Sequence, residues 1–138
     1  MTLIDVVPQR ALAVYAHPDD ADVSCGGTLS LWAGAGAHVE VVIATRGEKG
    51  SADPSTDPVQ LAERRAGEAA AALAEMGVAA HHNLDVPDGE LVNDPATRGS
   101  LLRLIRSVRP DVVVAPDPTA VLFGSGYVNH RDHRVLAR

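Results

Sequence analysis

The sequence has one cysteine and few aromatic residues. Cys25 has no second cysteine to pair with, so an intrachain disulfide and a disulfide-stabilised secreted scaffold are excluded. It is expected to be a small buried residue near a helix start. Aromatic residues make up only 3% of the chain, so a core must be built from Val, Leu, Ile and Ala.

Long apolar runs and an excess of positive charge are also missing. No run approaches the roughly 18–20 residues of a membrane-spanning helix. The first residues, MTLIDVVPQR, lack the charged start and apolar stretch of a secretory signal, so we expect a cytoplasmic protein. Acidic residues outnumber basic ones by 18 to 12, which disfavours nucleic acid as a partner because phosphate-binding proteins usually have the opposite balance.

What remains is the composition of an ordinary globular domain. Hydrophobic residues make up 46% and charged residues 22% of the 138 residues. No repeat or linker divides the chain, and its length fits one domain over 1–138. Six histidines are many for this length, which raises the question of whether they cluster.

Short apolar runs alternate with helical patterns along the chain. The runs predict four strands, at 11–16, 39–45, 80–86 and 111–115. Apolar residues at helical spacing predict three helices, at about 26–34, 58–76 and 96–109. Asp57 is the expected N-cap of the second helix and Gly77 its stop. Residues 116–129 are expected to form a loop, with a further helix opening near Asn129.

This alternation predicts an α/β fold, with a doubly wound, Rossmann-like and mostly parallel sheet covered by helices on both faces. If the strand order is 3-2-1-4, strand order reverses between strands 1 and 4. Ligands of such folds bind beyond the carboxyl ends of the strands at that point.

The motif His17-Pro18-Asp19-Asp20 stands at the carboxyl end of the first strand. Proline stiffens the turn, so one imidazole and two carboxylates point in fixed directions. One histidine, one carboxylate and a second histidine from elsewhere would make a three-ligand metal site with open positions, as in catalytic zinc and non-haem iron centres. The alternative is that the two aspartates only cap the next helix.

A second cluster, Asn129-His130-Arg131-Asp132-His133, follows the fourth strand. At the start of a helix, residues i and i+3 share a face, so His130 and His133 can point into one site. Both clusters therefore lie where the topology places a ligand. The other three histidines have no comparable partners and are expected to be structural or solvent-facing: His38, His81 and His82.

In order and spacing, five segments resemble the LmbE-like, PIG-L family of zinc-dependent de-N-acetylases. They are AHPDDADVSCGGTL, TRGEKG, ERRAGEAAAALAEMGV, LDVPDGEL and GYVNHRDHR, and together they extend over nearly the whole chain. The resemblance implies a hydrolase that removes an N-acetyl group from an amino sugar or a related small molecule. It implies Zn²⁺ as the cofactor, with Fe²⁺ as another divalent candidate.

The resemblance also implies residue roles. His17, Asp20 and His133 match the metal ligands, Asp19 matches the general base, and His130 matches the residue that stabilises the oxyanion or acts as acid. Five further positions match substrate-binding or ligand-supporting sites: Arg46, Arg65, Glu68, Asp88 and Tyr127.

The chain departs from the family pattern at Ala21, where the family usually has Glu. Asp22 could take that role from one position further on. If it does not, metal affinity is expected to fall, since losing a residue that supports a ligand commonly costs about 10–100-fold.

Family chains extend well past the HRDH motif, so residues 1–138 are expected to be the N-terminal part of a longer deacetylase domain. A second chain could supply the missing segment, and a homo-oligomer is possible. The abundance of Ala, Val and Arg suggests a bacterial source of high genomic GC content.

Two alternatives stay open. One is a non-catalytic or incomplete Rossmann-like domain that binds a sugar or nucleotide, although no GxGxxG follows the first strand. The other is a metal-dependent amidase acting on a non-sugar N-acyl substrate. With Trp32 assigned to the core, few aromatic residues remain to stack on sugar rings, which favours a small polar substrate over a long glycan: Tyr15, Phe123 and Tyr127.

Overall fold

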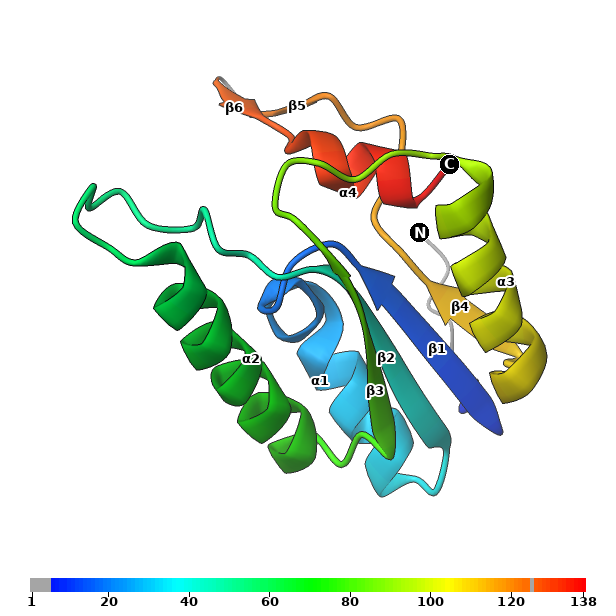
Figure 1. The fold of residues 1–138 in the computed structure, drawn as a ribbon. Coiled ribbons are helices and arrows are strands. Elements are labelled where there is room, and N and C mark those ends of the chain that lie inside the picture. Colours follow the sequence, from blue (N-terminus) through cyan, green and yellow to red (C-terminus); the bar gives the residue numbers. More distant parts are fainter. Residues whose placement is uncertain (1–5, 125) are drawn as a thin grey trace.

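A computed structural model describes residues 6–124 and 126–138. Its main feature is a four-stranded parallel sheet in the order β3-β2-β1-β4, as predicted (Figure 1). The strands agree with the predicted segments to within a residue or two at each end. Their bounds are β1 Arg10–Tyr15, β2 His38–Thr45, β3 Ala80–Val86 and β4 Val112–Val114.

Helices cover both faces of this sheet, which confirms the doubly wound class. The helices α1 (Asp20–Gly34) and α2 (Pro58–Glu75) lie on one face, and α3 (Pro95–Val108) and α4 (Arg131–Leu136) lie on the other (Figure 1). Alternate residues of β1 face the two layers, so Ala13 packs with α1 and α2 while Leu12 packs with α3 and α4. The central strands β1 and β2 are almost continuously buried, as expected where both faces are covered, whereas the edge strands β3 and β4 alternate between exposed and partly buried residues.

The caps of α2 and α3 follow from local chemistry. Asp57 accepts the backbone N–H of Val59 at 2.8 Å, and Pro58 occupies the first helical position. Asp94 caps α3 in the same way, through the N–H of Thr97 at 2.8 Å. These caps fix where both helices begin.

Two predictions of local structure were wrong. The first helix begins at Asp20, not near Gly26, so the HPDD motif opens directly into α1. Gly26 lies inside the helix because α1 packs closely there; an added Cβ would lie 3.0 Å from the Met76 sulfur. The segment 116–129 is not all loop, since it contains a two-stranded hairpin of β5 (Leu122–Phe123) and β6 (Tyr127–Val128).

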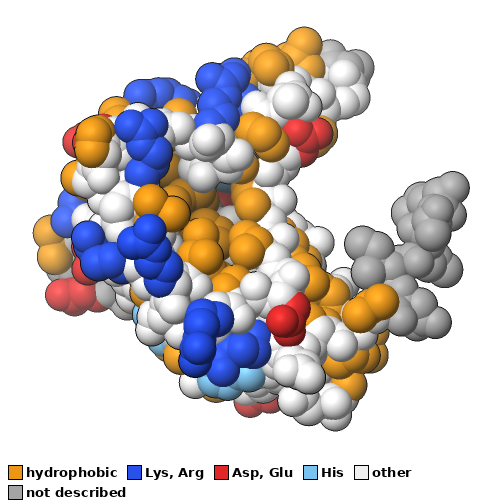
Figure 2. Space-filling model, turned by 90° about the vertical axis from the view of Figure 1, so that its right-hand side faces the viewer, with side chains coloured by type: hydrophobic (Ala, Val, Ile, Leu, Met, Phe, Trp, Pro, Cys, Tyr) orange, Lys and Arg blue, Asp and Glu red, His pale blue; other side chains and the backbone are white. Residues whose placement is uncertain are grey.

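The side of the molecule that carries α3 and β4 is hollowed. Hydrophobic side chains line the hollow, and Lys and Arg side chains lie beside it (Figure 2). β4 forms one edge of the sheet, and Val113 on it is 49% exposed. Within the described residues, no helix is both long and apolar enough to span a membrane.

Candidate metal centre

The turn between β1 and α1 holds His17 and Asp20 in a fixed arrangement. Oδ2 of Asp20 accepts the backbone N–H of His17 at 2.7 Å, and the N–H of Asp20 donates to the His17 carbonyl at 3.2 Å. Strand β1 thus delivers the imidazole, and the first residue of α1 delivers the carboxylate. Both stand at the carboxyl end of the sheet.

The first turn of α4 brings His133 to the same point. Its Nε2 lies 3.1 Å from Nδ1 of His17 and 3.1 Å from Oδ2 of Asp20. The third side of this triangle, from His17 Nδ1 to Asp20 Oδ2, is 3.2 Å. Three potential ligand atoms therefore converge on one position, although their residues lie up to 116 positions apart in the sequence.

Each histidine turns its other nitrogen to an acceptor. His17 presents Nε2 to Oδ1 of Asp88 at 3.2 Å, and His133 presents Nδ1 to Oδ1 of Asn129 at 2.8 Å. The side-chain amide of Asn129 also donates to the Ala120 carbonyl at 2.8 Å, which fixes its orientation. Because these acceptors can take the outward N–H protons, the inward nitrogens can present lone pairs to a metal when the rings are neutral.

This donor set fits a divalent metal. Two imidazole nitrogens and one carboxylate oxygen converge within 3.2 Å, and positive charge between them, from a shared proton or a metal ion, stabilises this arrangement. Ligand atoms about 2.0–2.1 Å from a tetrahedral zinc lie about 3.3 Å apart, close to the separations seen here. The buried carboxylates of Asp88 and Asp132 add negative potential, and outward hydrogen bonds from ligating histidines to acceptors are typical of metal sites.

The electrostatics of the cluster favour positive charge beside Asp20. Burial disfavours the charged form of His17, but the hydrogen bond to Asp20 and the charges of Asp20, Asp88 and Asp132 outweigh it and raise the pKa of His17. Burial also opposes ionisation of Asp20, yet hydrogen bonds from His133 and His17 hold the pKa of Asp20 well below its usual range. Asp20 is therefore a carboxylate at neutral pH.

A second group of potential ligands shares His17: it comprises His17, Asp88, His130 and Asp132. In this group Asp132 Oδ2 accepts the N–H of Gly89 at 2.7 Å and His130 Nδ1 accepts the N–H of Asp132 at 3.4 Å, whereas Oδ1 of Asp132 is buried without a hydrogen-bond partner. Asp132 is fully buried, so a metal held there would be shielded from substrate. All three members of the group of His17, Asp20 and His133 line an open cleft, whereas Asp132 of the second group does not.

Beside the three ligands, Asp19 is paired with Arg65 from α2. Nη2 of Arg65 donates to Oδ1 of Asp19 at 2.8 Å, and Nη1 donates to the Gly47 carbonyl at 2.8 Å. The Arg65 side chain is mostly buried whereas that of Asp19 is 62% exposed. Arg65 thus fixes the direction of a carboxylate that remains accessible to water.

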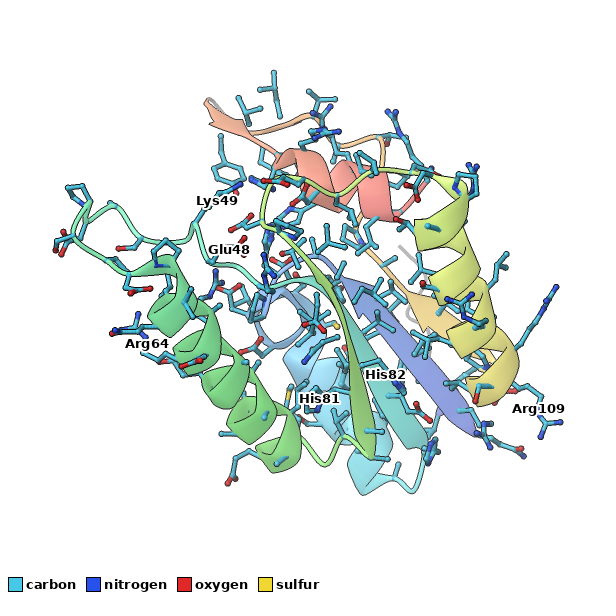
Figure 3. All side chains as sticks on the ribbon, viewed as in Figure 1. Glu48, Lys49, Arg64, His81, His82 and Arg109 are labelled. Carbon is cyan, nitrogen blue, oxygen red and sulfur yellow. The ribbon has the colours of Figure 1, made fainter. Side chains whose placement is uncertain are left out.

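An open cleft of about 340 Å³ runs over these residues. One side is formed by Lys49 and Gly50 after β2, and another by Tyr127 of the β5–β6 hairpin. Nζ of Lys49 donates to the Asp88 carbonyl at 2.6 Å, which ties the segment after β2 to the loop after β3; Figure 3 labels Lys49 and its neighbour Glu48 there. Ten residues line the cleft: His17, Asp19, Asp20, Lys49, Gly50, Arg65, Asp88, Tyr127, His130 and His133.

Eight of the ten site residues proposed from the sequence are therefore gathered in this cleft, and two lie elsewhere. Glu68 is exposed and lies 3.7 Å from Arg64, on the same helix. Arg46 is exposed, pairs with Glu48 at 3.4 Å, and lines a separate pocket between α2 and β3. Among the described residues, Asp22 makes no hydrogen bond to the three ligands, so it does not replace the family's usual Glu in that way.

Three residues contribute here to which the sequence analysis gave no role: Asn129 and Asp132, named only as members of the second cluster, and Lys49. Asn129 and Asp132 belong to the NHRDH segment. Both side chains are buried beside the histidines, and this burial cannot be read from a single sequence. Lys49 lies in the TRGEKG segment, and its place in the cleft depends on the path of the chain after β2.

The histidines at the other end of the sheet have a shared partner. Glu40 of β2 contacts His38 Nε2 at 2.7 Å and His82 Nε2 at 2.6 Å. The burial of Glu40 opposes ionisation, but these two hydrogen bonds lower its pKa. His81 lies on the opposite face of β3 from His82 (Figure 3). The three histidines thus lie outside the candidate metal cluster, and the pairing of His38 and His82 with Glu40 agrees with the structural role expected for them.

Comparison with known proteins gives consistent matches. A family model described as PIG-L, GlcNAc-PI de-N-acetylase, matches residues 12–138. The 1D-myo-inositol 2-acetamido-2-deoxy-alpha-D-glucopyranoside deacetylase of Kineococcus radiotolerans is 36% identical over 157 aligned residues, covering 91% of this chain and 42% of that protein.

Two solved structures share the fold. N,N'-diacetylchitobiose deacetylase from Pyrococcus horikoshii has a TM-score of 0.85 at 32% identity, covering 94% of this chain and 47% of that one. The 4-carboxy-2-hydroxymuconate hydratase from Pseudomonas putida has a TM-score of 0.78 at 26% identity, covering 94% and 52%. The chain spans about half the length of the relatives it matches.

Proposed function

Since the chain belongs to the GlcNAc-PI de-N-acetylase family, we propose that it carries the catalytic centre of a metal-dependent hydrolase. The proposed reaction removes the N-acetyl group of an N-acetylglucosamine-type amino sugar and yields acetate and a free amine. The proposed metal is zinc, with Fe²⁺ as another divalent ion suited to two histidines and a carboxylate.

One observation carries this proposal. Nδ1 of His17, Oδ2 of Asp20 and Nε2 of His133 lie within 3.2 Å of one another at the floor of a cleft, beside the accessible carboxylate of Asp19. A sugar- or nucleotide-binding domain has no need of two imidazole nitrogens and one carboxylate oxygen that converge in this way. A base next to a metal site is what amide hydrolysis requires.

His17, Asp20 and His133 would hold the metal, which when bound supplies a Lewis acid that makes water more acidic and polarises a carbonyl. Asp19 is the proposed general base. Because Arg65 engages its Oδ1, its Oδ2 is left to take the proton of the attacking water. Arg65 is a positioning residue in this scheme, since it acts through Asp19.

His130 is the proposed donor to the developing oxyanion. As the N-cap of α4 it accepts the N–H of Asp132 at Nδ1, so the neutral ring carries its proton on Nε2. Its side chain is 43% exposed, its ring lies 4.7 Å from that of His17, and it lines the cleft, which supports this role. A donor fixed in advance stabilises the negative charge that appears on the acetyl oxygen. The protonated Asp19 can then return its proton to the leaving amine.

The test is acetate release from N-acetylglucosamine and N,N'-diacetylchitobiose by the 138-residue chain, first stripped of metal and then reconstituted with zinc or Fe²⁺. We expect release only after reconstitution. The chain could instead bind metal tightly, release no acetate from either sugar, and hydrolyse another N-acyl compound. That result would identify the function as a non-sugar amidase. Failure to bind about one equivalent of either metal would overturn the metal-dependent mechanism and favour a binding domain.

A further inference from the structure

The 12 lysine and arginine side chains of the chain divide into two groups. Four of them lie within 3.7 Å of a carboxylate: Arg46, Lys49, Arg64 and Arg65. The others form no ion pair with a carboxylate among the described residues, and all belong to α3 and α4 or lie beside these helices: Arg10, Arg98, Arg103, Arg106, Arg109, Arg131, Arg134 and Arg138. These eight arginines make one side of an acidic protein basic, and we call it the basic face.

Acidic residues of the same elements do not neutralise the basic face. Asp94 caps the start of α3, and Asp111 accepts two backbone N–H groups at the start of β1, at 2.9 and 3.0 Å. Asp132 is fully buried. Nε of Arg134 is also buried, and it has no hydrogen-bond partner in the described part of the chain. The charge of the basic face is therefore free to attract an acidic partner.

Strand β4 has a free edge beside the basic face. It pairs with β1 on one side, and no described strand pairs with its other side. The N–H of Asp111 donates to the Arg10 carbonyl at 2.9 Å. Because backbone groups point to alternate sides along a strand, the N–H and C=O groups of Val112 and Val114 are directed away from β1. An edge of this kind is a template for another strand.

The surface of β4 that faces the α3 layer is bare. Val113 lies opposite Leu12 in the sheet, so both side chains point toward the α3 layer. Leu12 is fully buried, whereas Val113 is 49% exposed. Helix α3 therefore covers β1 and leaves β4 open. Figure 2 shows a hollow of hydrophobic side chains on this side of the molecule, with Lys and Arg side chains beside it.

One flank of α3 matches the hollow in chemistry. Ser100 and Arg103 line the groove between α3 and β3. Arg98, Leu102 and Arg106 follow one another at four-residue spacing, so they form a stripe on a different flank, away from β3. Leu102 is 49% exposed. The stripe presents an apolar side chain between two arginines.

We infer that the free edge of β4 binds an extended polypeptide segment, apolar at its centre and acidic at both ends, which adds a fifth strand to the sheet. The unpaired backbone groups match a strand, and the hollow accepts its apolar side chains. Arginines stand at both ends of the edge. Arg98 and α4 lie toward its carboxyl end, and Arg109 projects from the end of α3, just before β4 begins (Figures 1 and 3).

Other occupants fit this surface less well. A lipid bilayer is flat and does not fill a hollow, and it has no backbone groups to pair with a strand edge. A second copy of the chain related by a two-fold axis would bring the eight arginines against one another, which is unfavourable.

Fluorescence anisotropy with a designed peptide tests the inference. The probe has three central valines flanked on each side by a threonine and two glutamates, and it carries fluorescein. We expect it to bind the chain at low ionic strength and to bind more weakly as salt is added. Lysines in place of the glutamates should lower the affinity about tenfold or more. Methylation of two adjacent central amides should do the same, because it blocks strand pairing without changing charge.

Two charge reversals on the protein locate the binding surface. Arg98→Glu should lower the affinity for the glutamate peptide about tenfold, because it replaces attraction with repulsion. Arg64→Glu is the matched control, since it makes the same change of charge on α2, where Arg64 is exposed and pairs only with Glu68. It should leave the affinity unchanged within about twofold.

Absence of binding by the glutamate peptide, or equal losses in the two variants, would overturn the inference. Equal binding of the methylated peptide would also overturn it, because no strand would be added. Size-exclusion chromatography and phosphatidylserine vesicles test the other occupants. A dimer that Arg98→Glu dissociates and Arg64→Glu does not, or tighter binding to the vesicles than to the peptide, would contradict the proposed partner.

Discussion

Nδ1 of His17 lies 3.1 Å from Nε2 of His133, although each ring directs its other nitrogen to an acceptor. With the outward nitrogens engaged, the two inward nitrogens and Oδ2 of Asp20 form a triangle of potential ligand atoms 3.1–3.2 Å apart. A divalent cation bound there would replace any proton shared among these atoms. This relationship connects two segments 116 residues apart, and the predictions below depend on it.

In the proposed mechanism one residue transfers the proton and others bind the metal. Substitutions of Asp19 and of His133 should therefore cause different losses. Asp19→Asn should leave zinc bound and reduce kcat by about 10²–10⁴-fold, the contribution typical of a general base. His133→Ala should lose the metal, because one of three ligands is removed. Zinc content by atomic emission and acetate release by a coupled assay, on both variants, check this. Full activity in Asp19→Asn would remove Asp19 from the mechanism.

Asn129 should control metal affinity without touching the metal. Asn129→Ala removes the acceptor that orients His133, and we expect the zinc dissociation constant to rise about 10–100-fold. Competition with a chromogenic chelator measures it. Asn93→Ala is the control, since Asn93 is exposed and contacts Arg98 instead; equal affinities in the two variants would contradict the role of Asn129.

The glycines after β2 leave room for Arg65. A Cβ on Gly50 would lie 2.5 Å from Nη1 of Arg65, so Gly50→Ala must displace the guanidinium from Asp19 or from the Gly47 carbonyl. We expect kcat to fall about tenfold or more while zinc stays bound, because the base loses its orientation.

Gly67→Ala in α2 is the matched control, because nothing lies within 4 Å of a Cβ at that position. It should keep the activity and raise stability by about 0.5–1 kcal/mol, since alanine favours a helix over glycine. Comparable losses of kcat in both variants would mean that Gly50 acts through folding rather than through Arg65.

The pairing of Glu40 with His38 and His82 should make stability depend on pH. The folded-state pKa of Glu40 is lowered, so its contribution is complete above the unfolded pKa near 4.5 and is lost as pH falls through the lower folded value. Glu40→Gln should therefore cost about 1–3 kcal/mol at pH 7 and much less near pH 3. Urea unfolding at both pH values measures the difference, and a cost that does not change with pH would refute the charged pairing.

The order of strands and helices followed from periodicity, because buried parallel strands are continuous apolar runs and the crossovers carry clear helical patterns. The start of α1 could not be read, since Gly26 looks like a helix breaker until its packing against Met76 is known. The hairpin of β5 and β6 was missed because strands of two residues have no period.

The cleft was predictable where residues stand at strand ends. His17 was proposed because it follows β1, and His133 because it comes after β4. Strand order reverses between these two strands. The pairing of Asp19 with Arg65 and of His133 with Asn129 depends on side-chain directions in three dimensions. The register that sets His82 beside Glu40 is likewise fixed by strand pairing, which local sequence does not encode.

The most direct test of the metal centre is an anomalous difference map from crystals of the chain soaked in zinc, collected on both sides of the zinc absorption edge. We predict one strong peak at coordination distance from Nδ1 of His17, Oδ2 of Asp20 and Nε2 of His133. A peak on the other side of the His17 ring, between Asp88 and Asp132, or the absence of any peak at His17, would contradict the proposed centre.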